Sequence, residues 1–203
     1  MYKSSKFLAG QNDSGGYEHP PEGEYPGRCF GIASLGTQSF KFDGEIRSAL
    51  KMALLFEIPG IQREDRGRSV PAVATFIAVD SMAPRSMMRK ALESWRGRPF
   101  TREEERTFDY ATLVGVPVRF TITHRESGGR TYVNLDHFKA AGADVPAQFH
   151  GEILYTPDAH DQEMFSRLPP HLKRMVERSP EYRRAMNEGF DSKTKEQDDD
   201  IPF

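Results

Sequence analysis

Segments patterned like β-strands come in a fixed order along this chain, and that order limits the folds open to it. Residues 25–34, 50–58 and 70–79 are apolar or β-branched stretches bounded by turn residues, which is typical of strands. In the second stretch every other residue from Leu50 to Ile58 is apolar, so one face should be buried. The sequence therefore predicts three successive strands.

A helical interlude follows the third strand. Pro84 suits a first helical turn. Apolar residues recur at helical spacing up to Trp95, and Gly97 stands where a C-cap is expected. Residues 101–104 form a capping-box pattern that starts a second, short helix. We expect these helices to separate the first three strands from the rest of the sheet.

A predicted hairpin completes the block. Residues 116–124 alternate apolar and polar side chains, Gly128-Gly129 supplies the turn, and residues 130–135 return. Three strands, a helix and a hairpin are the order of the five-stranded OB-fold, a small barrel that binds oligonucleotides. Periodicity does not give strand order, so other small barrels fit the same pattern. We expect a mainly β protein with an OB-fold barrel.

The two ends of the chain differ in character from this block. The sequence predicts a flexible arm at 1–22, the OB-fold domain at 23–145, a loop and helical extension at 146–188, and a disordered linker with an acidic tip at 189–203. Pro169-Pro170 should interrupt the helix expected over 161–186. That extension could pack on the barrel or form a homodimer, and the sequence does not decide.

The composition indicates the cellular compartment and shows how charge is distributed along the chain. The chain has 203 residues and one cysteine, Cys29, which excludes a disulfide within one chain and fits a reducing cytosol. It lacks a membrane-spanning run of apolar residues and a leader-type apolar stretch. The net charge is −2, yet residues 85–130 carry ten basic and six acidic side chains. The expected location is the cytoplasm of a bacterial host.

Enzyme motifs are missing from the sequence. It shows no P-loop, dinucleotide-binding glycine pattern or nucleophile elbow. The six histidines have no metal-ligand spacing with Cys29; they are His19, His124, His137, His150, His160 and His171. We therefore expect no enzyme, no cofactor and no metal.

The last six residues read as a peptide displayed to a partner. Asp198, Asp199 and Asp200 cannot be buried unpaired, and Pro202 ends regular structure. Ile201 and Phe203 could enter an apolar pocket while basic groups of the partner bind the carboxylates. The tip resembles the acidic C-terminal tail of bacterial single-stranded-DNA-binding proteins, which recruits replication and repair enzymes. The resemblance implies the same partners here.

A second resemblance covers roughly residues 20–185. It rests on three phrases, which are Gly23-Glu24-Tyr25 through Gly36-Thr37-Gln38, Leu92 through Phe100, and Leu113-Val114-Gly115 leading into Val118-Arg119-Phe120. They resemble a family of bacteriophage OB-fold single-stranded-DNA-binding proteins. Residues 168–170 and 179–182 are similar to that family's helical extension. The resemblance implies a protein that coats unpaired DNA in replication, recombination and repair.

Binding of single strands requires cations for the phosphates and aromatic rings for the bases, each stack being worth about 1–3 kcal/mol. Candidates are Arg28 and Phe30 in the first strand; Phe40, Lys41, Phe42, Arg47 and Lys51 in and after the next loop; Arg63, Arg66 and Arg68 in the connection after the second strand; Trp95, Arg96 and Arg98 at the helix end; and Arg119 and Tyr132 on the final hairpin. Phe30 and Trp95 could instead fill the core, and the arginines of the connection could pair with neighbouring acids.

Two other functions fit the same sequence. A replisome adaptor would use the tip and bind little DNA, which the near-neutral body charge favours. A strand-annealing or RNA-binding barrel would use the same kind of groove. Binding of poly-dT compared with duplex would test the adaptor, and strand annealing compared with strand melting would test the second alternative.

Overall fold

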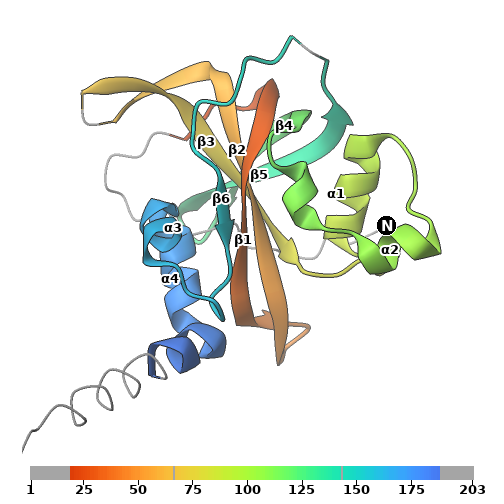
Figure 1. Cartoon of the computed structure of the whole chain (residues 1–203), viewed down its shortest axis with the longest axis vertical. Coiled ribbons are helices and arrows are strands. Elements are labelled where there is room, and N and C mark those ends of the chain that lie inside the picture. Colours follow the sequence, from red (N-terminus) through yellow and green to blue (C-terminus); the bar gives the residue numbers. More distant parts are fainter. Residues whose placement is uncertain (1–18, 66, 143, 188–203) are drawn as a thin grey trace, which may run out of the picture.

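The computed structural model describes residues 19–65, 67–142 and 144–187. Its elements are β1 (Gly23–Phe42), β2 (Glu45–Asp65), β3 (Arg68–Val79), α1 (Met87–Arg96), α2 (Arg102–Thr107), the 3-10 helix η1 (Tyr110–Leu113), β4 (Pro117–Ser127), β5 (Arg130–Ala140), β6 (Ile153–Tyr155), α3 (Gln162–Arg167) and α4 (Pro170–Arg178). Residues 180–187 are also helical. The protein is mainly β with a few short helices, as predicted (Figure 1).

One sheet carries the fold, and β1 is its centre. The five long strands are antiparallel in the order β3-β2-β1-β4-β5, and β6 pairs in parallel with β1. One edge of β1 pairs with β2. Along the other edge, residues 23–28 pair with β4 and residues 31–33 pair with β6. Two register shifts against β2, at Cys29/Gly31 and Ser34/Gly36, allow β1 to bend between them.

The sheet curls but stays open, which departs from the expected closed barrel. Phe76 of β3 and Phe138 of β5 meet across the gap with ring centroids 5.0 Å apart. In the part of the chain that the structure describes, no ladder joins these two edge strands. β5 is distorted at its edge, because His137 has a φ of 53° and Ser94 of α1 donates its hydroxyl to the Phe138 carbonyl at 2.5 Å. Side-chain packing, rather than backbone pairing, spans the gap.

Two hairpins extend well beyond the predicted strands. Phe40, Lys41 and Phe42 were expected in a loop but end β1, and the turn is Asp43-Gly44, both with positive φ. Arg63 lies in β2 and Arg68 in β3, not in a connection. Both faces of these strand ends meet solvent, so the sequence lacks the alternation that would have revealed them.

The sheet buries apolar side chains on both faces. Leu54, Phe56 and Ile58 of β2 belong to the core beneath α1. Ala53 and Leu55 point the other way, into a second core under β6, α3 and α4. This double burial explains why β2 reads as a nearly continuous apolar run rather than a clean alternation.

The C-terminal extension packs on the sheet, which answers a question the sequence left open. Leu172 and Val176 of α4 are fully buried in the second core. The carboxylate of Glu181 accepts hydrogen bonds from the backbone N–H of Thr37 at 2.9 Å and from its hydroxyl at 2.6 Å. Gly36 has a φ of 67°, and a Cβ there would lie 2.5 Å from the Cβ of Ser179. The extension is thus fitted closely to β1.

Docking of α4 should weaken in acid through His171. Burial, with a smaller effect from Arg174, lowers the pKa of His171 to about 4. Its imidazole lies 3.1 Å from the Thr75 hydroxyl. The imidazole of the unfolded chain is protonated below about pH 6.5, so stability present above that pH should fall by about 2 kcal/mol between pH 7 and pH 5 and be lost further as the pH approaches 4. Urea titrations at pH 7 and pH 5 would measure this loss. His171→Gln should flatten the difference; an equal loss in that variant would assign it to other groups.

Candidate nucleic-acid interface

The β1–β2 hairpin displays aromatic rings beside cations. Phe42 is 42% exposed, and the guanidinium of Arg47 lies 4.9 Å from its ring centroid. The ammonium of Lys51 lies 5.1 Å from the ring of half-buried Phe40. Burial lowers the pKa of Lys51. Lys41 is exposed, and because strand side chains alternate it projects from the other face of β1 than Phe40 and Phe42. Lys51 itself is only 7% exposed, so the open pair is Phe42 with Arg47, which offers a base a ring to stack on and a phosphate a charge to bind.

The other two hairpins also carry candidate residues. At the β2–β3 hairpin Arg68 is exposed and Arg63 is half-buried, and Arg66 lies outside the described residues. On β4 and β5, Phe120 is buried in the core, whereas Arg119 and Tyr132 are half-buried. Arg119 lies 3.7 Å from the carboxylate of Asp144, an ion pair at the surface.

Two predicted stacking residues lie in the core. Phe30 is 3% exposed and packs under the helical extension. Trp95 is 4% exposed, its indole N–H donates to the Pro117 carbonyl at 2.9 Å, and its ring meets Phe56 edge-on at 5.6 Å. Neither ring is open to a base in this arrangement, because the strand and helix faces that carry them face inward. Both side chains fill the core, which was the alternative that the sequence left open.

Three predicted cations are engaged within the fold. Arg28 donates to the carbonyl oxygens of Val145, Pro146 and Gly115. Arg96 and Arg98 both bind the carboxylate of Glu104, at 2.7 and 2.6 Å, and hold the pKa of that carboxyl well below its usual range. These arginines stabilise loops, so we place the candidate interface elsewhere.

The helical extension covers the outer face of β2 and β3. Leu55 and Ile77 point outward from these strands and are buried in the second core with Leu172 and Val176. A single strand that crossed this face would have to displace α4. The surface left open is therefore the hairpins.

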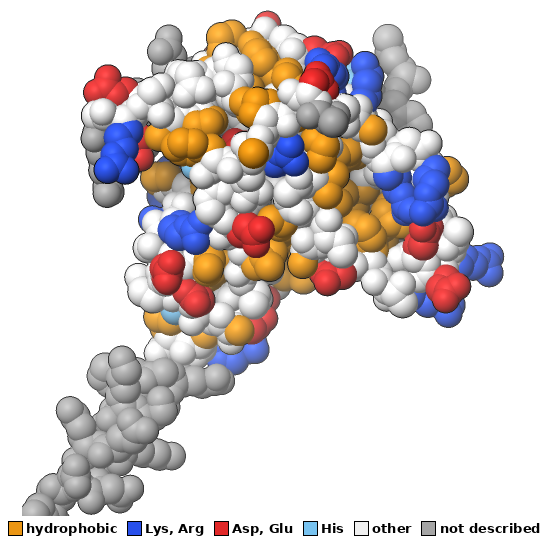
Figure 2. Space-filling view, turned by 45° about the horizontal axis from the view of Figure 1, so that its top comes forward, with side chains coloured by type: hydrophobic (Ala, Val, Ile, Leu, Met, Phe, Trp, Pro, Cys, Tyr) orange, Lys and Arg blue, Asp and Glu red, His pale blue; other side chains and the backbone are white. Residues whose placement is uncertain are grey.

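Charge is mixed on the surface that Figure 2 shows. Hydrophobic side chains form several groups there, and Lys and Arg are scattered among Asp and Glu. A groove of about 490 Å³ between η1 and β6 is lined by Asp80, Asp109 and Asp158, and the described residues that line it include no Lys or Arg. This groove would repel phosphates and is not part of the candidate interface.

The described part of the chain offers neither a metal-binding cluster nor a reactive thiol. No cluster of three or more His, Cys, Asp or Glu side chains there could hold a metal ion. Cys29 is buried, and burial raises the pKa of its thiol to about 12, so it is not a thiolate at neutral pH. The helices of the described residues include none long and apolar enough to cross a membrane.

Two features escaped the sequence analysis. Phe149 is exposed on the loop between β5 and β6, and Glu57 is a fully buried carboxylate in β2. They are joined across 92 positions of the chain, so no local pattern could have linked them. The predicted tip, Asp198 through Phe203, lies outside the described residues.

Comparisons with known proteins identify no relative: no family model, no curated protein and no solved structure matches the chain.

Proposed function

We propose that the chain is an OB-type single-stranded-DNA-binding protein. The strand order and the position of α1 between β3 and β4 support the OB-type assignment. Phe76 and Phe138 would complete an imperfect barrel by packing across the gap between β3 and β5. The helical extension distinguishes this version of the fold, because it covers the strand 2–3 face that OB-folds use for oligonucleotides.

The exposed β1–β2 hairpin is the observation that carries the proposal. It combines Phe40 and Phe42 with Lys51 and Arg47 at cation–π distance. Isolated apolar side chains at a surface are common, but rings paired with cations match the two groups that an unpaired strand exposes. Stacking accepts any base, so binding should depend little on sequence. The protein would coat unpaired DNA during replication, recombination and repair.

A length and salt series with fluorescent oligo-dT tests this function. Trp95 is buried, so the anisotropy of a labelled oligonucleotide is a better signal than the protein's own fluorescence. We expect affinity to rise with length up to one site and to fall linearly with the logarithm of salt concentration. Affinity independent of oligonucleotide length and salt would contradict the proposal.

The acidic tip would recruit partners and compete weakly with DNA. Deleting residues 198–203 should abolish binding of replication or repair enzymes. It should also tighten oligo-dT binding about threefold at low salt, because the competing carboxylates are gone. Deletion of Phe203 alone keeps the three aspartates and should leave DNA affinity unchanged. If the longer deletion behaves like wild type at every salt concentration, self-competition is wrong.

An adaptor with little DNA binding is the second candidate. The covered outer face of β2 and β3 favours it, since the usual oligonucleotide surface is occupied by α4. In that case the tip deletion would remove partner binding, while oligonucleotides would show only weak, salt-sensitive retention.

A further inference from the structure

Charged side chains of the sheet hold the loop 145–150 at both ends. Arg28 of β1 donates to the carbonyls of Val145 and Pro146 at 2.8 and 2.9 Å. The Glu57 carboxylate of β2 accepts the backbone N–H of Phe149 at 3.0 and 3.1 Å and that of His150 at 2.9 Å. Because Arg28 and Glu57 are paired positions of the β1–β2 ladder, one point of the sheet fixes the whole loop.

Burying the carboxylate of Glu57 to hold the loop is unfavourable in free energy. Its side chain is fully buried, and burial of a charge is unfavourable unless hydrogen bonds satisfy it. An apolar residue packed at such a position is often as stabilising or more so. What the carboxylate supplies here is geometry, because it accepts two successive N–H groups and so fixes the backbone at residues 149 and 150.

The hydrogen bonds to this loop leave one exposed aromatic ring, Phe149, on a fixed stretch of backbone. Phe149 is 58% exposed. Its ring meets that of His150 at 5.3 Å, and His150 in turn packs against Phe30 at 5.0 Å. The imidazole Nε2 of His150 also lies 3.1 Å from the Pro71 carbonyl of β3. Since the backbone is already ordered, a ligand that stacks on Phe149 would lose little conformational entropy.

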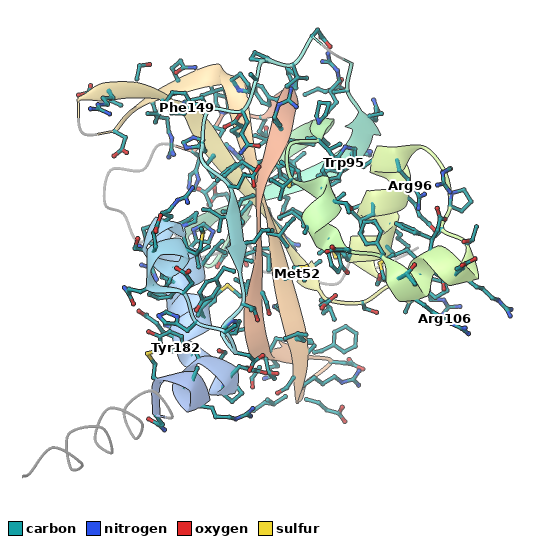
Figure 3. All side chains as sticks on the ribbon, viewed as in Figure 1. Met52, Trp95, Arg96, Arg106, Phe149 and Tyr182 are labelled. Atoms are coloured by element: carbon teal, nitrogen blue, oxygen red, sulfur yellow. The ribbon has the colours of Figure 1, made fainter. Side chains whose placement is uncertain are left out.

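The surroundings of Phe149 suit a nucleic-acid base better than a protein surface. Figure 3 shows Phe149 beside the β2–β3 hairpin, which carries Arg63 and Arg68. Among the described residues of 145–150 and of the hairpin at 59–70, Phe149 is the only large apolar side chain that is exposed. Protein interfaces need a wider apolar patch, whereas a base needs one ring and a nearby cation for its phosphate.

We propose that Phe149 stacks on a base of single-stranded DNA and that Glu57 and Arg28 are positioning residues for it. This inference rests on the proposed function. It adds a second contact at the β2–β3 end of the sheet, at the opposite end of β2 from the β1–β2 hairpin.

Oligo-dT and an abasic chain of the same length separate stacking from charge. Phe149→Ala should weaken oligo-dT binding about tenfold and change abasic-chain binding less than about twofold, because phosphate contacts persist. Phe149→Tyr should retain wild-type affinity. Leu154→Ala removes an apolar side chain of similar exposure, 49%, on β6 and should have no effect.

Glu57→Gln tests positioning, because its amide would face N–H donors that need acceptors. It should lower affinity for oligo-dT but not for the abasic chain, and it should add nothing in the Phe149→Ala background. Wild-type oligo-dT affinity in Phe149→Ala, or an equal loss on the abasic chain, would overturn the inference and leave the proposed function standing. Failure of the wild-type protein to bind oligo-dT would overturn both.

Discussion

Replacing Phe40 and Phe42 together by alanine should weaken oligo-dT binding about a hundredfold, because two stacking contacts of about 1–3 kcal/mol each are lost. Both rings lie on the projecting β1–β2 hairpin with cations over them. Since both faces of the hairpin are largely solvated, the variant should unfold at nearly the wild-type temperature. Anisotropy titrations and thermal melts would measure the two quantities.

Matched variants separate ring stacking from general apolarity. Replacement of both phenylalanines by leucine keeps apolar volume without a π face and should not rescue binding, whereas replacement by tyrosine should. Ile46 is 82% exposed on the same hairpin, so Ile46→Ala serves as a control with no expected loss. If the leucine variant bound as tightly as wild type, the hairpin would not contact bases by stacking.

Trp95→Ala should destabilise the fold by about 3–5 kcal/mol, because it removes a large buried side chain and leaves a cavity. The ring packs on Phe56, and its N–H satisfies the Pro117 carbonyl. For a chain of this size the melting temperature should fall by roughly 10 °C. Chemical denaturation monitored by circular dichroism would give the loss without relying on tryptophan fluorescence.

The oligo-dT affinity of a folded Trp95 variant distinguishes a role of Trp95 in core packing from a contact with a DNA base. Trp95→Phe preserves much of the packing but loses the hydrogen bond, so it should cost about 1–2 kcal/mol and keep oligo-dT affinity. A stable Trp95→Phe protein with much weaker DNA binding would show that Trp95 touches DNA after all.

The strand and helix positions followed from local patterns. Each predicted strand segment lies within a long strand, except that Val116 precedes β4, and α2 begins after the expected Thr101 cap. Pro84 was expected in the first turn of α1, but that helix begins at Met87 after a Ser86 cap. The strands and α1 bury at least one face, so their apolar periodicity reflects that burial, whereas the largely exposed α2 is predicted by its capping box. The closed barrel did not follow, because the gap between β3 and β5 depends on a bulge at His137 and a helix contact far away in sequence.

The candidate interface was harder to read than the fold. Hairpin ends such as Phe40–Phe42 have both sides near solvent and therefore no periodic signal. Arg28 was a candidate phosphate-binding cation, but its partners are carbonyls 87 to 118 residues away in the sequence. Helix α4 covers β2 and β3, although from the sequence its apolar face could equally have packed against a second copy of the chain. Long-range packing of this kind produces no local sequence pattern from which it could be predicted.

Competition between single-stranded and duplex DNA would show whether the protein prefers unpaired strands. Labelled oligo-dT would be bound at about 50 mM salt, where phosphate contacts are strong, and then displaced with unlabelled DNA of equal length. We expect single strands to compete at concentrations at least about tenfold lower than duplex, because only they expose base faces. Equal competition by the duplex, or no binding above that of an inert protein, would contradict the proposed function.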